Sequence, residues 1–142
     1  MKRKTINEII KISGERKIKM LTTYTANVAR LTAEIADILL VGDSLGMVLY
    51  GMPSTHGVTL DMIINHTRAV VLAAKLPLII ADMPFGTVEK NKEEAFESCA
   101  KVVTQTNCDA VKIEGGVEMA ETIKFLVERG IPVCGHIGLM PQ

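Results

Sequence analysis

The sequence predicts an α/β fold with a parallel sheet, and three observations support this prediction. Apolar runs of strand length alternate with segments of helical periodicity along the chain. Hydrophobic residues make up 48% of the chain but aromatic residues only 4%, which is typical of aliphatic sheets covered by helices. Four of the apolar runs end in polar or charged residues, at the position where parallel α/β folds bind ligands. With 142 residues, the chain is long enough for one domain with a core and too short for two.

The elements follow from the periodicity in chain order. A short amphipathic helix is expected to begin after Thr5 and to end near Gly14, because Thr5 and Glu8 have the spacing of a capping box. The expected strands cover residues 18–24, 38–42, 78–81, 110–114 and 132–136. The expected helices between them cover residues 26–35, 59–75, 92–105 and 117–128.

Two of these segments carry more specific expectations. In the helix over 26–35, we expect Val28, Leu31, Ala33 and Ile35 to be available for packing. Residues 44–57 are rich in glycine and are interpreted as a long connection, which in a compact domain is more often functional than idle.

Strands that are separated by helices are expected to pair in parallel through right-handed crossovers. Two architectures fit this order of elements. One is an open, doubly wound sheet, and the other is part of an eight-stranded β/α barrel.

Composition excludes several classes of function. Sixteen basic residues balance sixteen acidic ones, so nucleic acid and anionic membranes are not expected as partners. No apolar run approaches membrane-spanning length. Cys99, Cys108 and Cys134 are odd in number and lie in apolar segments, which indicates buried thiols in a reducing compartment. The sequence therefore predicts a soluble, cytoplasmic protein.

The polar residues at the strand ends are the candidate site. They are Asp43, Asp82, Lys112, Glu114 and His136. Because carboxylates are hard oxygen ligands, the three acidic residues favour Mg²⁺ over zinc or copper.

Some residues of this set admit more than one interpretation. Lys112 and Glu114 share one face of a strand and are either a structural ion pair or part of a site in which Lys112 holds a substrate carboxylate. His136 is a core histidine, a hydrogen-bond donor to substrate or a metal ligand, and the last is the weakest interpretation because no second histidine lies at ligand spacing.

Four longer stretches, read in order, carry a family resemblance. They are Val41-Gly42-Asp43-Ser44-Leu45-Gly46-Met47, Ala81-Asp82-Met83-Pro84-Phe85, Val111-Lys112-Ile113-Glu114-Gly115-Gly116 and Gly135-His136-Ile137-Gly138-Leu139-Met140-Pro141-Gln142. Together they closely resemble the ketopantoate hydroxymethyltransferase (3-methyl-2-oxobutanoate hydroxymethyltransferase) family.

The resemblance implies a β/α barrel of the phosphoenolpyruvate/pyruvate group, of which residues 1–142 form one partial domain with about five strands. It implies Mg²⁺ at Asp43, Asp82 and Glu114. It implies binding of 3-methyl-2-oxobutanoate at Asp43, Ser44, Asp82 and Lys112. The co-substrate is then 5,10-methylenetetrahydrofolate, and the product, 2-dehydropantoate, belongs to pantothenate biosynthesis. Because the family is typically decameric, a homo-oligomer is also implied.

The chain departs from the family pattern in two respects. The family usually has an aspartate after the sequence Thr-Thr-Tyr, where this chain has Thr25. The family's general base is a glutamate beyond residue 142, so no catalytic residue is assigned and His136 is kept as an accessory candidate.

Two alternatives remain. One is another Mg²⁺-dependent oxo-acid lyase of the same barrel type, and the other is a non-catalytic remnant or subunit. If only five barrel strands are present, we expect two open sheet edges and an exposed apolar face that includes Ile123 and Leu126.

Overall fold

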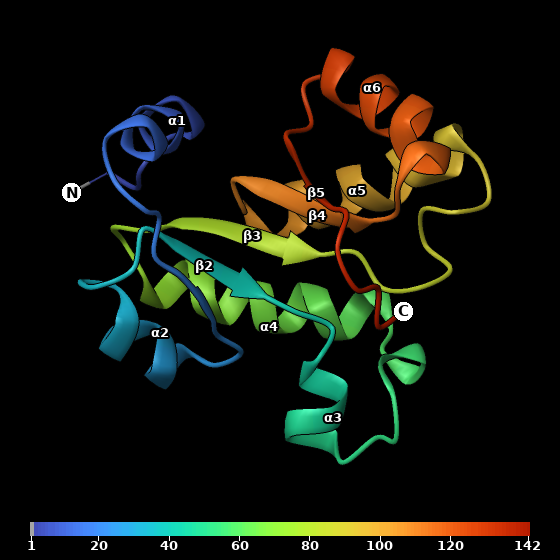
Figure 1. The fold of residues 1–142 in the computed structure, drawn as a ribbon. Helices are drawn as coiled ribbons and strands as arrows, with labels where there is room; N and C mark the ends of the chain where they lie inside the picture. Colours follow the sequence, from blue (N-terminus) through green and yellow to red (C-terminus); the bar gives the residue numbers. More distant parts are fainter. Residues whose placement is uncertain (1) are drawn as a thin grey trace.

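The computed structural model describes residues 2–142 and contains one five-stranded parallel sheet (Figure 1). Of the predicted domain, only residue 1 lies outside the described residues. The strands are β1 (Met20–Thr22), β2 (Ile38–Val41), β3 (Leu78–Asp82), β4 (Ala110–Glu114) and β5 (Val133–His136). The α-helices are α1 (Ile6–Glu15), α2 (Ala26–Thr32), α3 (Leu45–Tyr50), α4 (Leu60–Ala73), α5 (Lys92–Thr106) and α6 (Ala120–Glu128).

The order of the strands decides between the two expected architectures. The spatial order is β1-β2-β3-β4-β5, the same as the order along the chain, and every neighbouring pair is parallel. A doubly wound sheet reverses its strand order at a switch point, whereas a β/α barrel adds each strand beside the previous one. The helices that connect successive strands also contact one another, α2 with α4, α4 with α5 and α5 with α6. The fold is therefore a β/α barrel segment of five strands with β1 and β5 at its edges.

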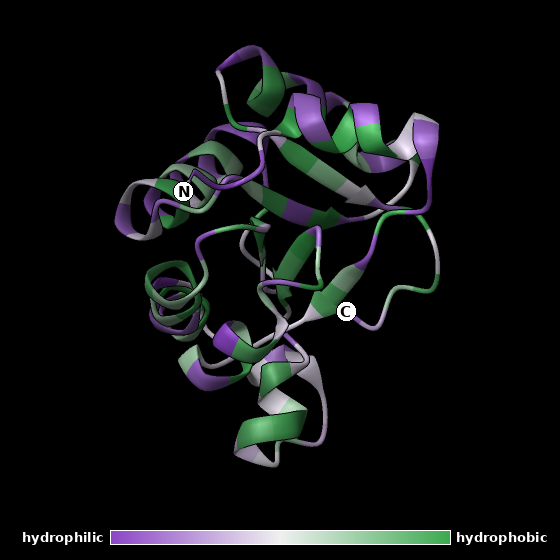
Figure 2. Ribbon diagram, turned by 90° about the vertical axis from the view of Figure 1, so that its left-hand side faces the viewer, coloured by the Kyte–Doolittle hydropathy of each residue, from purple (hydrophilic) through white to green (hydrophobic). Residues whose placement is uncertain are grey.

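One face of the sheet packs under these helices. Its strand side chains are aliphatic and fully buried, as are the helix residues against them. Figure 2 shows strands of the sheet largely in the green of hydrophobic residues. They include Leu39, Val41, Ile79, Ala81, Val111 and Ile113 from the strands, and Ile63, Val70, Val102 and Leu126 from the helices. Each fully buried Val, Leu or Ile side chain stabilises a fold by about 1.5–3 kcal/mol. This layer holds the strands, and hence their carboxyl ends, in register.

The other face of the sheet forms the concave side of the barrel segment. Near the amino ends of the strands it is apolar, and α1 covers it with Ile9, which packs with Ile38, Leu78, Ile80 and Ala110. Figure 1 shows α1 at this end and the C-terminus at the end toward which the strand arrows point. The carboxyl-end half of this face therefore lies beyond the cover of α1.

Helix α1 begins as the sequence predicts and ends one residue later. Glu8 N–H donates to Thr5 Oγ1 at 3.3 Å and Thr5 N–H donates to Glu8 Oε2 at 2.6 Å, which confirms the capping box. Gly14 is the penultimate residue of the helix rather than its end. Helix α2 is capped by Thr25, whose Oγ1 accepts a hydrogen bond from Val28 N–H at 3.4 Å, so that the departure at Thr25 retains a capping side chain.

Four expectations about the elements are wrong or incomplete. The expected connection over 44–57 contains α3 and a 3₁₀ turn, η1 (Thr55–Gly57). The apolar run after Ser44 forms the helix, and Gly51, in a left-handed conformation with φ of 67°, ends it. The helix expected over 117–128 begins instead with a 3₁₀ turn, η2 (Val117–Met119). The strand expected over 18–24 is confined to β1, and the helix expected over 26–35 ends at Thr32.

The expected packing face of α2 is wrong for its large residues and correct for Ala33, which is buried. Val28, Leu31 and Ile35 are exposed, Leu31 at 80%, whereas Ala29 is fully buried. Helix α2 packs against α4 through a small side chain, so a hydrophobicity pattern that favours large residues selects the opposite face. The expected exposure of Leu126 is likewise wrong, because this residue is fully buried in the layer between sheet and helices.

All three cysteines are free thiols. Cys99 and Cys108 are buried and Cys134 is half-buried on the concave face, as the sequence predicts for reduced thiols. Across residues 2–142, none of the helices is both long and apolar enough to cross a membrane.

Candidate functional site

The strand register brings the predicted polar residues into two rows on the concave face. Asp82 lies opposite Lys112, and Lys112 lies opposite Cys134. In the next row, Glu114 lies opposite His136. Because side chains alternate along a strand, all of these residues lie on the same face of the sheet as the apolar residues that α1 covers. They lie two to four positions closer to the carboxyl ends of the strands than those apolar residues.

Lys112 is the centre of this cluster. Its Nζ donates to both oxygens of Asp82, at 2.9 and 3.0 Å, and to Glu114 Oε1 at 2.8 Å. Burial opposes a charged ammonium, but the two carboxylates outweigh this effect and the pKa of Lys112 is raised. Lys112 is therefore a fixed positive charge, held between a residue of its own strand and one of the neighbouring strand.

The carboxyl group of Asp82 is harder to ionise than usual, although it is paired with Lys112. The residue is only 2% exposed, and burial raises the pKa of its carboxyl group to about 6 in spite of Lys112. The neighbouring carboxylate of Asp43 adds to this increase, while the Asp43 N–H donates to Asp82 Oδ2 at 3.3 Å. Two buried carboxylates thus lie close enough to interact at the ends of β2 and β3, where an additional cation would stabilise the ionised pair.

Glu114 links the cluster to β5 and has an unused oxygen. Its Oε1 accepts hydrogen bonds from Lys112 and from His136 Nδ1, the latter at 2.9 Å. Burial raises the pKa of Glu114, but these two hydrogen bonds outweigh it, so the pKa is lowered and the carboxylate is ionised. The Oε2 atom is buried and has no hydrogen-bond partner in the described part of the chain. A buried oxygen of this kind is normally satisfied by a bound water, an ion or a ligand atom.

Gly42 and Ser44 border the carboxylate pair on the β2 side. A Cβ atom on Gly42 would lie 3.0 Å from Ser44 Oγ and 3.7 Å from Asp82 Oδ2. Glycine therefore leaves space beside Asp82 that any larger residue would fill. Ser44 Oγ makes no capping bond to α3 and is instead hydrogen-bonded to the hydroxyl of Tyr24 at 2.8 Å.

Cavities open on both sides of Lys112 and Glu114. One of about 350 Å³ lies on the concave face and is lined in part by Lys112, Cys134 and His136. Another of about 360 Å³ is lined in part by Glu114, Phe85 and Gln142. The cluster is therefore reachable by a small molecule, although its charged atoms are buried.

The donor set is compatible with Mg²⁺ but is not a complete cage. Within residues 2–142, no group of three or more His, Cys, Asp and Glu side chains is arranged to hold a metal ion. Mg²⁺ usually keeps several waters and uses one or two carboxylates together with substrate oxygens. Asp43 and Asp82 supply such a pair, although both Asp82 oxygens also accept from Lys112. Glu114 Oε1 is occupied by Lys112 and His136, but its Oε2 is left without a partner in the described part of the chain.

Comparison with known sequences identifies the family. The sequence profile described as ketopantoate hydroxymethyltransferase matches residues 3–142. The chain belongs to the ketopantoate hydroxymethyltransferase family. A curated family member from Agrobacterium fabrum, named 3-methyl-2-oxobutanoate hydroxymethyltransferase, is 57% identical over 141 residues, which are 99% of this chain and 50% of the relative. The chain spans about half the length of the curated relatives it matches.

Solved structures of similar fold confirm the barrel type. Phosphonopyruvate hydrolase, solved in complex with oxalate and Mg²⁺, superposes with a TM-score of 0.73 at 14% identity and covers 93% of this chain and 52% of its own. A 2,3-dimethylmalate lyase of the PEP mutase/isocitrate lyase superfamily superposes with a TM-score of 0.60 at 14% identity, covering 92% of this chain and 51% of its own. The chain of the ketopantoate hydroxymethyltransferase family thus corresponds to about half of such a barrel, as the sequence predicts.

Two residues beside the site were not assigned from the sequence. Tyr24 follows the first strand, so the same strand-end rule that selected Asp43 and Asp82 applies to it. Gln142 lies beyond β5, and its Nε2 donates to Asp43 Oδ2 at 2.8 Å and to the Met83 carbonyl at 2.9 Å. Gln142 ends the fourth stretch that carries the family resemblance, but only the folded chain brings its side chain to Asp43.

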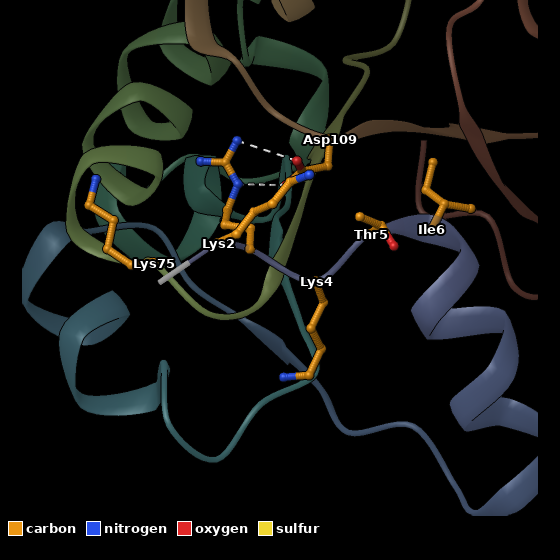
Figure 3. Close-up of a pocket in the computed structure, with 7 residues that line it drawn as sticks. Lys2, Lys4, Thr5, Ile6, Lys75 and Asp109 are labelled. Carbon is orange, nitrogen blue, oxygen red and sulfur yellow. Dashed lines mark hydrogen bonds and ion pairs between the residues drawn. The ribbon is translucent and has the colours of Figure 1, made fainter.

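Another cavity, of about 420 Å³, lies at the opposite end of the sheet (Figure 3). Lys75 and Asp109, which line it, precede β3 and β4 rather than follow them. Arg3 is paired with Asp109 at 2.9 Å, and Figure 3 shows Lys4 and Lys75 extending in different directions. This cavity is where the N-terminal segment is anchored to the barrel and is remote from the carboxyl-end cluster.

Proposed function

We propose that the chain carries the Mg²⁺ and 2-oxo-acid site of a ketopantoate hydroxymethyltransferase. The observation that supports this most directly is the buried group of Asp43, Asp82, Lys112 and Glu114 at the carboxyl edge, in a chain 57% identical to a relative of that name. The proposed reaction transfers the one-carbon unit of 5,10-methylenetetrahydrofolate to C3 of 3-methyl-2-oxobutanoate. With consumption of one water molecule, it yields 2-dehydropantoate and tetrahydrofolate.

The proposed metal site uses Asp43 and Asp82, with Glu114 as the third carboxylate. When bound there, Mg²⁺ supplies Lewis-acid stabilisation of the negative charge that develops on the keto oxygen as C3 loses its proton. A nearby cation also removes the mutual repulsion that, together with burial, raises the pKa of Asp82.

The other residues hold the oxo acid. Lys112 presents a permanent positive charge to the substrate's oxygen atoms, and its position is held by Asp82 and Glu114. Ser44, with Tyr24 behind its hydroxyl, donates a hydrogen bond to the substrate. His136 acts as an accessory through Glu114, whose Oε1 it contacts.

We assign no general base to this chain and propose that it belongs to the half of the family's length that this chain does not span. The domain proposed for residues 1–142 is a single partial barrel, in which β1 and β5 pair with further strands of the same barrel. The proposed full assembly is a cytoplasmic homo-oligomer. Sedimentation of the chain with and without a fragment carrying the remaining strands tests the proposed strand pairing and the oligomeric state. An assay for 2-dehydropantoate on the same samples tests where the general base lies. Product formation by the pure chain would remove the non-catalytic alternative.

A melt with ligand tests the site itself. Mg²⁺ and 3-methyl-2-oxobutanoate at a hundredfold excess over Kd should stabilise the folded chain by about 2.7 kcal/mol. Asp82→Ala should abolish this increase, whereas Asp61→Ala, at an exposed ion pair, should retain it. A parent chain that is folded by circular dichroism but does not respond to the ligand would contradict the proposal.

Specificity separates the lyase alternative. If pyruvate stabilises the chain as strongly as 3-methyl-2-oxobutanoate, the C3-methyl groups are not recognised and an oxo-acid lyase becomes the better description. A preference for the methylated substrate of tenfold or more supports the transferase.

A further inference from the structure

His66, on α4, contacts two segments that border the oxo-acid site. Its Nδ1 lies 2.6 Å from the backbone carbonyl oxygen of Tyr24, in the turn between β1 and α2. Its Nε2 lies 3.0 Å from the hydroxyl of Tyr50, the last residue of α3. The two rings also meet edge to face, with centroids 5.9 Å apart.

The chemistry of the partners determines the tautomer of a neutral His66. A carbonyl oxygen can only accept a hydrogen bond, so Nδ1 carries the proton and donates to Tyr24. Nε2 then has a lone pair and accepts a hydrogen bond from the Tyr50 hydroxyl. His66 therefore donates one hydrogen bond through Nδ1, to Tyr24, and accepts one through Nε2, from Tyr50.

These contacts close a ring of interactions around α3. Tyr24, whose backbone His66 holds, makes the side-chain hydrogen bond to Ser44 at 2.8 Å. Ser44 precedes the first residue of α3, and Tyr50 ends it. His66 thus acts on both ends of α3, directly at Tyr50 and through Tyr24 at Ser44.

Helix α3 depends on such contacts for its position. It has only six residues, and isolated helices of this length are not stable in water. Leu45 and Gly46 are buried, but the four residues that follow, Met47 to Tyr50, are all more than 40% exposed. The outer turn of α3 therefore has little apolar burial of its own.

We propose that His66 is a positioning residue for the oxo-acid site, which fixes the Ser44 hydroxyl through Tyr24 and holds α3 against the barrel. This proposal rests on the proposed function, because it assumes that Ser44 contacts the substrate. His66 itself does not contact the substrate.

Two isosteric variants separate the two contacts. In His66→Asn, the amide nitrogen occupies the place of Nδ1, so the Tyr24 contact is retained and the Tyr50 contact is lost. In His66→Gln, the amide reaches the place of Nε2, so the Tyr50 contact is retained and the Tyr24 contact is lost. Tyr50→Phe is the control that removes the second contact without changing His66.

The first measurement is hydrogen exchange of the ligand-free chain, followed by mass spectrometry. His66→Asn and Tyr50→Phe should both increase exchange about fivefold near the end of α3 and leave residues 23–29 unchanged. His66→Gln should increase exchange about fivefold to tenfold over residues 23–29. Exchange that is unchanged in both segments in all three variants would overturn the proposal.

The second measurement is affinity for 3-methyl-2-oxobutanoate with Mg²⁺ by calorimetry. His66→Gln should weaken binding about tenfold, and His66→Asn by less than about threefold. In a Tyr24→Phe background, where the Ser44 contact is already absent, His66→Gln should add less than a twofold loss. A full tenfold loss in that background would mean that His66 does not act through Tyr24, and would overturn the proposal.

The two measurements keep this inference separate from the proposed function. If the parent chain binds no oxo acid, the proposed function fails, while the segment-specific exchange pattern still supports or overturns the positioning role. A variant that melts at lower temperature but has parent-like exchange in residues 23–29 and 44–50 shows a merely structural role, which also overturns it.

Discussion

Asp37 and Asp82 are two buried aspartates at opposite ends of the same sheet, exposed by 3% and 2% respectively. Asp37 immediately precedes β2, and Asp82 ends β3. Hydrogen bonds from Arg16 hold the pKa of Asp37 far below its usual range, whereas burial raises the pKa of Asp82 to about 6. Two aspartates with similarly small exposed fractions thus have pKa values shifted in opposite directions.

The two carboxyl groups differ in how strongly burial desolvates them and in their hydrogen-bond partners. Asp37 accepts two hydrogen bonds from the Arg16 guanidinium, at 2.7 and 2.8 Å, and one from Lys19 N–H at 3.0 Å. Asp82 shares one ammonium with Glu114 and lies beside a second carboxylate, Asp43. Asp37 is a completed structural ion pair, whereas the carboxyl-end cluster has an excess of negative charge that a ligand can neutralise.

The largest expected effect concerns the cation of the carboxyl-end cluster. Lys112→Met should lower the free energy of unfolding by about 3–5 kcal/mol, because two buried carboxylates lose their shared counter-charge. Urea denaturation followed by circular dichroism measures this. Lys101→Met, at an exposed pair with Asp61, is the matched control and should cost less than about 1 kcal/mol. Equal losses in the two variants would mean that burial of the cluster is energetically unimportant.

The next effect concerns the amino-end aspartate. Asp37→Asn should lower the free energy of unfolding by about 2 kcal/mol, because hydrogen bonds to a charged group are lost. The same denaturation experiment measures it, with Asp61→Asn as the control. A loss no greater than that of the control would contradict the structural role of Asp37.

The pH dependence should follow from the lowered pKa of Asp37. The folded state favours the ionised carboxylate, so the unfolded state binds more protons at acidic pH. This stabilisation is complete above the unfolded pKa of about 4 and is lost as pH falls below it toward the folded pKa. Between pH 5 and pH 3 the parent should lose on the order of 1 kcal/mol more than Asp37→Asn. Parallel curves of melting temperature against pH for the two proteins would exclude this contribution.

The smallest effect is expected at Asp82. Asp82→Asn should change the free energy of unfolding of the ligand-free chain by less than about 1 kcal/mol, because burial already disfavours the ionised carboxylate and the amide oxygen can still accept from Asp43 N–H. The same variant should not respond to Mg²⁺ and oxo acid. If it is destabilised as strongly as Asp37→Asn, the contrast between the two aspartates fails and Asp82 is structural as well.

The candidate site residues were selected from the sequence because they obey a positional rule. Asp43, Asp82 and Glu114 each follow an apolar run, and parallel strands deliver their carboxyl ends to one edge. The spacing of Lys112 and Glu114 placed them on one face, and the structure joins them at 2.8 Å. Asp37, which precedes its strand, follows no such rule and was not singled out.

The errors have a common physical cause. Apolar periodicity indicates which face of a helix carries large hydrophobic side chains, but not which face packs against the rest of the protein. Helix α2 packs through the face that contains Ala29. Glycines in residues 44–57 suggested a loop, but Gly46 lies within α3, where a Cβ would lie 2.5 Å from Val58 Cγ2. That glycine is required by close packing rather than by a turn.

By itself, the sequence determined the alternation of strands and helices, the parallel pairing, the family and the edge at which charged residues gather, because these depend on local periodicity and on the direction of the strands. Only the tertiary structure decided which charges are neutralised and which are not. The pKa of Asp37 falls because Arg16 reaches its carboxylate, and that of Asp82 rises because its carboxyl group is desolvated by burial and, to a lesser extent, because Asp43 lies nearby. The contacts of His66 and Gln142 were likewise decided by folding, since each joins segments far apart in the chain. Such contacts depend on distances between elements, which no local pattern encodes.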